Sequence, residues 1–171
     1  MKTVLFLCTG NSARSILAEA VANRLGAGRL RAFSAGSHPK GAVNPGALAL
    51  LGREGYDLAG LRSKSWDEFA GRSARAIDIV ITLCDEAAGE SCPIWPGAPI
   101  EGHWGIPDPA AALPHDSEAA FRLAYERITS RIAALLSLPL ETLSSVALAA
   151  ALVRIGAGSE GATARARDGL A

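Results

Sequence analysis

A strand, a tight loop and a helix follow one another at the N-terminus, and they constrain the fold more than any other stretch. Residues 4–7 are all apolar, which predicts a buried strand. An amphipathic segment that starts near Ser15 predicts a helix ending at Gly26. The loop between them is short and its residues are mostly small, and Gly10 can adopt a positive φ. This succession is typical of an α/β protein.

The same loop has the residue types of an anion site with a nucleophile. Five residues separate Cys8 from Arg14. Backbone N–H groups at a helix start can surround an anion, and Arg14 can hold a tetrahedral oxyanion with two parallel hydrogen bonds. The predicted oxyanion-binding residues are Thr9, Gly10, Asn11, Ser12, Ala13, Arg14 and Ser15. Cys8 among such donors is expected to be a nucleophilic thiolate, with a hydrogen bond from Ser15. The alternative is a structural cysteine before an ordinary turn.

Strand and helix patterns alternate along the rest of the chain. Strands are expected at residues 31–34, 77–83 and 101–104, and helices at residues 45–54 and from Ser117 onward. Alternation predicts a parallel sheet with helices on both faces, hence one three-layer α/β domain. Ligands bind such sheets where the strand order reverses, at the carboxyl ends of the strands. Cys8 and Cys84 each follow a strand that is expected there.

The C-terminal part has a different character. Leu138-Pro139-Leu140 ends the long helix, and residues 142–155 are apolar on most sides, which predicts a buried or partnered helix. That helix is expected to dock either on the helices of the sheet or on a second subunit. We therefore divide the chain into a domain at 1–137, a helical extension at 138–155 and a disordered tail at 156–171.

Charge and cysteine content exclude several classes of function. The 17 basic and 17 acidic residues cancel, so no overall field attracts nucleic acid or an acidic membrane. The first apolar run is too short for a signal peptide or a membrane span, and a cytoplasmic location is expected. Three cysteines do not suggest a structural disulfide framework. The histidines lack metal-ligand spacing, so we expect no metal site and no cofactor.

Cys84 and Cys92 are separated by seven residues. This spacing is wider than that of a redox Cys-x-x-Cys motif and unlike most zinc sites. The intervening segment contains Gly89, small residues and acids, which predicts an exposed, mobile loop that would let Cys92 reach Cys84. Alternatively, Cys84 packs at the end of a strand and Cys92 is an incidental thiol.

Asp108 lies between Pro107 and Pro109, and the two prolines restrict its backbone. A general acid must be held close to the leaving oxygen, which a restricted loop after the last strand allows. The alternative is that Asp108 is an ordinary turn residue.

The stretch Cys8-Thr9-Gly10-Asn11-Ser12-Ala13-Arg14-Ser15, followed by Ala18-Glu19-Ala20, resembles the phosphate loop of low-molecular-weight protein tyrosine phosphatases. It is closer to the arsenate reductases that share this fold. The resemblance implies a four-stranded parallel sheet in the order 2-1-3-4, to which this chain adds a C-terminal helix. It also implies that Asp108 is the general acid. Thioredoxin-linked reductases of this fold carry two redox cysteines after the third strand. Cys84 and Cys92 resemble that pair, although the segment between them is slightly longer here.

The resemblance implies that the chain reduces arsenate to arsenite in arsenic detoxification. Cys8 would attack arsenate while Asp108 protonates the departing oxygen, Cys84 would then attack Cys8, and the disulfide would pass to Cys84–Cys92. Thioredoxin or another thiol would reduce that disulfide, and phosphate or sulfate would mimic arsenate. Two alternatives stay open: a tyrosine phosphatase that uses only Cys8, Arg14 and Asp108, and a non-catalytic oxyanion-binding domain.

Some relatives also bind a monovalent cation with residues equivalent to Asn11, Glu19 and Ser34. The acidic partner expected near Lys64 is missing from this sequence. We therefore do not predict that site.

Overall fold

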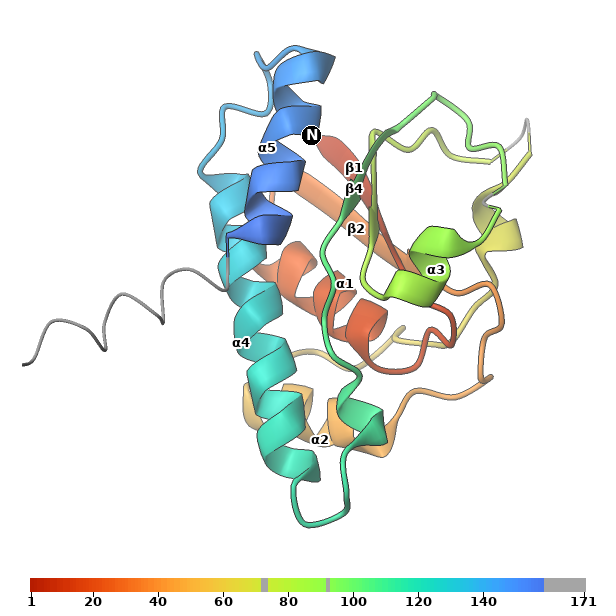
Figure 1. Ribbon diagram of the computed structural model, residues 1–171, viewed down its shortest axis with the longest axis vertical. Coiled ribbons are helices and arrows are strands. Elements are labelled where there is room, and N and C mark those ends of the chain that lie inside the picture. Colours follow the sequence, from red (N-terminus) through yellow and green to blue (C-terminus); the bar gives the residue numbers. More distant parts are fainter. Residues whose placement is uncertain (72–73, 92, 159–171) are drawn as a thin grey trace, which may run out of the picture.

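A four-stranded parallel sheet forms the centre of the molecule (Figure 1). The computed structural model describes residues 1–71, 74–91 and 93–158. The strands are β1 (Lys2–Leu7), β2 (Leu30–Ala35), β3 (Ile79–Thr82) and β4 (Ile100–His103). They are arranged in the order β2-β1-β3-β4, and every neighbouring pair is parallel. The predicted sheet order is therefore confirmed, and the strand order reverses between β1 and β3.

The long helices occur where the sequence patterns predict them, and three short helical segments are additional. The long helices are α1 (Arg14–Leu25), α2 (Pro45–Arg53), α4 (Ser117–Leu136) and α5 (Ser145–Ala157), and the additional segments are η1 (Trp66–Phe69), α3 (Asp85–Gly89) and η2 (Pro109–Ala111). The start of α2 follows from its cap, because the Asn44 side chain accepts a hydrogen bond from the Gly46 N–H at 2.8 Å and Pro45 occupies the first turn.

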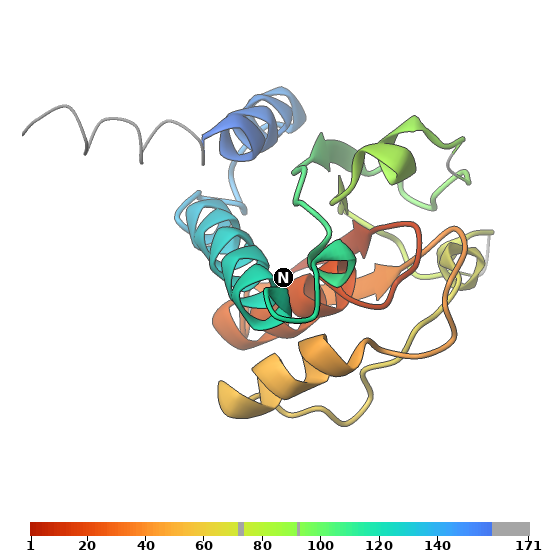
Figure 2. The same ribbon diagram turned by 60° about the horizontal axis from the view of Figure 1, so that its bottom comes forward.

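Alternate residues of β1 pack into two clusters on opposite faces of the sheet. Phe6 joins the larger cluster, which includes buried residues of α1, α2, α4 and α5. Leu5 and Leu7 join the smaller cluster with Phe69 of η1 and Trp95. Helices therefore cover both faces, as predicted, but unequally: the long helices gather on one side, and the short η1 covers the other (Figure 2).

Helix α5 is part of the fold and packs against β4 and α4 of its own chain (Figure 1). Leu148 and Leu152 are buried in the larger cluster, and the indole N–H of Trp104 donates to the Leu152 carbonyl at 3.2 Å. Of the two dockings that the sequence leaves open, the intramolecular one is observed. The expected tail lies outside the described residues from position 159 onward. Within the described ranges, no helix is long and apolar enough to cross a membrane.

Candidate active site

The loop from Cys8 to Ala13 connects β1 to α1 and lies where the strand order reverses. A segment after β2 fixes its backbone from outside. The carbonyl oxygens of Thr9, Gly10 and Ser12 accept hydrogen bonds from the N–H groups of His38, Lys40 and Asn44 at 2.9, 2.9 and 2.8 Å. These carbonyls therefore face away from the interior of the loop, toward residues after β2. The N–H groups of residues 9–13 make no hydrogen bond within the described part of the chain, so they are available to an anion.

Gly36 permits this packing because the loop backbone passes directly against it. A Cβ atom at position 36 would overlap the Thr9 carbonyl oxygen and lie 2.8 Å from the Cys8 carbonyl oxygen. On its other side, the Gly36 N–H donates to the Lys64 carbonyl at 3.0 Å, and its carbonyl accepts from the Trp66 N–H at 3.0 Å. The residue at position 36 must therefore be a glycine for a reason that has nothing to do with its φ.

Asn11 supports the loop from inside. Its φ is 38°, a left-handed conformation that asparagine tolerates better than most residues. Its amide nitrogen donates to Ser15 Oγ at 2.8 Å and to Ser34 Oγ at 2.9 Å. Ser15 Oγ in turn lies 2.9 Å from Cys8 Sγ. When Cys8 is a thiolate, the Ser15 hydroxyl is the donor of that pair, as the sequence predicts.

Arg14 and Asp108 meet at the mouth of the loop. One Arg14 nitrogen donates to the Ile106 carbonyl at 3.1 Å, and another lies 3.6 Å from an Asp108 carboxylate oxygen. The Arg14 side chain is 12% exposed and the Asp108 side chain 37% exposed. The other Asp108 oxygen accepts from the Ala110 N–H at 3.2 Å. Asp108 is thus held beside the anion cradle with one oxygen near Arg14 and within reach of solvent.

Cys84 is buried against the loop that contains Cys8, and the two cysteines share one small cluster with Ala87. The segment after Cys84 was expected to be a mobile loop, but residues Asp85–Gly89 form α3. Cys84 caps this helix: its sulfur accepts from the Ala87 N–H at 3.4 Å and lies 3.6 Å from Thr9 Oγ1. The loop expectation failed because the cap and the buried Ala87 give this short acidic segment a reason to be helical.

Cys92 lies outside the described residues, so its predicted place beside Cys84 is not tested. The two described cysteines are both free thiols. Of the five predicted catalytic residues, Cys8, Arg14, Asp108 and Cys84 therefore gather at one end of the sheet.

Two adjoining pockets open at this end of the sheet. The first, of about 350 Å³, contains the anion cradle and has these lining residues: Cys8, Thr9, Gly10, Ser12, Ala13, Arg14, His38, Lys40, Glu86 and Asp108. The second, of about 540 Å³, includes Cys84 in its wall and shares Arg14, Glu86 and Asp108 with the first. No Phe, Tyr or Trp side chain lines either pocket among the described residues. The site therefore suits a small, highly charged substrate.

Sequence reasoning missed three residues of the pocket that contains the anion cradle. His38 and Lys40 reach the cradle through the segment after β2, and Glu86 reaches it from α3. No local motif marks them, because each depends on a contact with a distant part of the chain. Only the position of His38 and Lys40 directly after the second strand could have suggested a role.

A histidine contact also escaped the sequence analysis. His103 at the end of β4 lies 2.8 Å from Thr82 Oγ1 through Nδ1 and 3.0 Å from Asp85 Oδ1 through Nε2. This contact ties the first residue of α3 to the sheet. Among the described residues, no group of three or more His, Cys, Asp and Glu side chains is arranged to hold a metal ion.

Comparison with known proteins agrees with this geometry. The family model of low molecular weight phosphotyrosine protein phosphatase matches residues 3–147. An arsenate reductase of Halalkalibacterium halodurans is 38% identical over 133 residues, which is 77% of this chain and 92% of the relative.

Solved structures agree as well. A thioredoxin-dependent arsenate reductase of Corynebacterium glutamicum superimposes with a TM-score of 0.61 at 27% identity, over 80% of this chain and 61% of that one. An arsenate reductase in the phosphate-binding state also gives a TM-score of 0.61, at 31% identity over 78% of this chain and 98% of the other. The chain therefore belongs to the low molecular weight phosphotyrosine protein phosphatase family.

Proposed function

We propose that this protein reduces arsenate to arsenite and that Cys8 is the nucleophile. One observation carries the proposal: a second thiol, Cys84, is buried in the same small cluster as Cys8, beside the anion cradle. A phosphatase has no use for that thiol, whereas reduction of arsenic needs two electrons from a pair of thiols. The relatives named arsenate reductase support the same activity.

The first step is displacement at arsenic. Arsenate lies in the cradle with its oxygens on the loop N–H groups and on Arg14, which offset its charge. The Cys8 thiolate attacks arsenic, and the As–O bond on the far side breaks. Asp108, protonated, gives its proton to the departing oxygen, which leaves as water. The product is a Cys8–arsenic(V) thioester.

The second step is the reduction. The Cys84 thiolate attacks Cys8 Sγ, an S–S bond forms, and the S–As bond breaks with its electron pair remaining on arsenic. Arsenic leaves as arsenite, and two thiols have been oxidised to one disulfide. The hydrogen bond from the Ala87 N–H to the Cys84 sulfur favours the thiolate form that makes this attack.

The third step restores Cys8. Cys92 attacks Cys84, which releases the Cys8 thiolate and leaves a Cys84–Cys92 disulfide for an external dithiol. Thioredoxin is the reductant that we propose, because the C. glutamicum relative is thioredoxin-dependent. Helix α3 lies between the two cysteines in the sequence and has only five residues, so its unwinding during this exchange would cost little.

The pocket favours arsenate over a phosphotyrosine side chain. Burial of a tyrosyl ring needs apolar or aromatic walls, but here the cradle is lined by charged and small residues such as Lys40 and Glu86. Phosphoryl transfer to Cys8 would need only Cys8, Arg14 and Asp108, and the presence of all three in the wall of the cradle pocket supports that reaction too. We therefore expect slow hydrolysis of a small aryl phosphate as a side activity.

Oxidation of NADPH in the presence of thioredoxin and thioredoxin reductase tests the proposal. Wild-type protein is expected to consume NADPH only when arsenate is added, and Cys84→Ser and Cys92→Ser are each expected to abolish that consumption. Lys2→Met, at a half-buried residue on the first strand, is the control and should match the wild type. Arsenate-dependent turnover that survives Cys84→Ser would refute the relay. Turnover with a low-molecular-weight thiol alone would change the reductant and keep the reaction.

A further inference from the structure

A buried ion pair lies behind the anion cradle, and the reaction steps above do not use it. Lys64 Nζ and Glu19 Oε2 are 3.0 Å apart, and the two side chains are only 5% and 12% exposed. Burying two charges is costly, and such a pair is weak evidence for stability. Its position relative to Cys8 suggests a different role.

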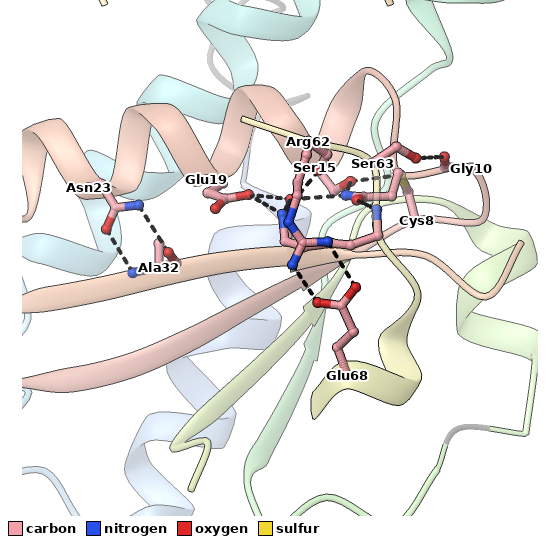
Figure 3. Close-up of polar contacts among 12 residues, drawn as sticks. Cys8, Gly10, Ser15, Glu19, Asn23, Ala32, Arg62, Ser63 and Glu68 are labelled. Atoms are coloured by element: carbon pink, nitrogen blue, oxygen red, sulfur yellow. Dashed lines mark hydrogen bonds and ion pairs between the residues drawn. The ribbon is translucent and has the colours of Figure 1, made fainter. Parts of the chain in front are cut away.

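A continuous chain of polar contacts leads from this pair to the nucleophile (Figure 3). The Ser34 hydroxyl donates to Glu19 and accepts from Asn11, whose amide nitrogen also donates to Ser15. Ser15 reaches Cys8 Sγ. The chain therefore begins at a carboxylate and ends at a second anionic group, the thiolate.

Lys64 holds this chain at two points. Its backbone N–H donates to Asn11 Oδ1 at 2.7 Å, which fixes the orientation of the amide, because that N–H can only donate. Its ammonium donates to Glu19, to Ser34 Oγ at 3.3 Å and to the Arg62 carbonyl at 3.1 Å. The amide nitrogen of Asn11 must therefore face Ser15, and the Ser15 proton is left for the sulfur.

The ammonium of Lys64 is also the cation that neutralises Glu19. The nearby guanidinium of Arg62 bonds Glu68 at 2.8 Å and adds only a weaker, longer-range attraction to Glu19 (Figure 3). Without Lys64, the negative charge of Glu19 would act on the Cys8 thiolate through a poorly solvated interior, where charges interact over longer distances than in water. The thiolate would then be disfavoured.

We infer that Lys64 is a positioning residue for the reaction: it neutralises Glu19 and orients Asn11, so that Ser15 and the loop can keep Cys8 ionised. The inference rests on the proposed function only in that Cys8 is the nucleophile. Its test measures the reactivity of Cys8 directly, without arsenate, and can fail while arsenate reduction stands.

The test is the rate at which iodoacetamide alkylates Cys8, followed by mass spectrometry of the Cys8 peptide between pH 5.5 and 9.5. Only the thiolate reacts. Lys64→Met leaves Glu19 uncompensated and is expected to slow alkylation at pH 6 about tenfold. Glu19→Gln keeps an acceptor for Ser34, leaves the ammonium uncompensated, and is expected to accelerate alkylation at pH 6 by a similar factor. All rates should converge at pH 9.5.

The two variants are expected to change the alkylation rate in opposite directions, which distinguishes a positioning role from a purely structural one. If the pair only braces the fold, both variants should change the alkylation rate in the same direction, or neither should change it; either result overturns the inference. If one variant does not fold, the direction in which the other changes the alkylation rate at pH 6 still tests the inference. Lys2→Met exchanges the same residue types at a half-buried ion pair with Asp78, on the first strand, and should leave the profile unchanged.

Discussion

Replacing Gly36 by alanine tests the claim that the position of the loop backbone sets activity. The added Cβ would overlap the Thr9 carbonyl oxygen and lie 2.8 Å from the Cys8 carbonyl oxygen and 2.9 Å from the Asn11 nitrogen. All three are backbone atoms, which cannot rotate away as a side chain can. Gly36 cannot retreat either, since its own N–H and carbonyl are bonded to Lys64 and Trp66. The loop must therefore shift by several tenths of an ångström.

The expected cost follows from that geometry. Overpacking of this kind destabilises by about 2 kcal/mol, which lowers Tm by about 4–8 °C in a domain of this size. Displacement of the cradle should reduce arsenate turnover by about 10- to 100-fold, because small misplacements of reacting groups are costly. Thermal unfolding and the NADPH assay measure the two effects separately.

Gly52→Ala is the matched control for Gly36→Ala. Gly52 lies in α2, and a Cβ there meets only a Leu58 methyl group at 3.8 Å. Alanine is expected to leave turnover unchanged and to raise stability by about 0.5–1 kcal/mol, since it favours the helix. Gly36→Ala protein with wild-type Tm and turnover within twofold of wild type would refute the reasoning.

Three further predictions follow from other contacts. Arg14→Lys keeps the charge but loses the planar fork, and should raise the KM for arsenate at least about tenfold; an unchanged KM would exclude Arg14 from oxyanion binding. Leu152→Ala in α5 should lower the free energy of unfolding, measured in urea, by about 2–5 kcal/mol. Val153→Ala, on the exposed side of the same helix, should lower it by less than about 0.5 kcal/mol. Equal effects would show that α5 is not part of the core. The hydrogen bond from Arg62 holds the pKa of Glu68 below its usual value. Since a lowered pKa stabilises the fold only while the carboxyl is ionised, Glu68→Gln should cost less than about 1 kcal/mol at pH 7 and nothing once the pH has fallen well below the pKa of Glu68.

Local patterns in the sequence were sufficient to predict the strands, the long helices and most of the candidate site. The apolar run before Cys8, the Asn44-Pro45 cap and the β-branched stretch at 77–83 each determine their structure within a few residues. The parallel sheet then brings Cys8 and Cys84 to the same edge, because both follow neighbouring strands. Residues of this kind can be placed from sequence alone.

The remaining features depend on contacts between distant segments. Lys64 forms an ion pair with Glu19, which is 45 residues away in the sequence. The N–H groups of His38 and Lys40 can bond to the loop only after β2 has paired with β1. The docking of α5 depends on Gly102, whose missing side chain gives room to Leu152. The sequence analysis predicted a mobile loop where α3 lies, because a cysteine sulfur is an unusual cap and the acidic residues around it resemble a solvated loop.

A single-turnover measurement tests the central claim that Cys8 and Cys84 reduce arsenate together. Fully reduced protein, freed of external thiol, is mixed with excess arsenate, and both the arsenite formed and the remaining thiols are counted. The account predicts about one arsenite per chain and the loss of two of the three thiols. It predicts no arsenite from Cys84→Ser. Arsenite from that variant in the same yield as from wild type, or no arsenite from wild-type protein that still hydrolyses an aryl phosphate, would contradict it.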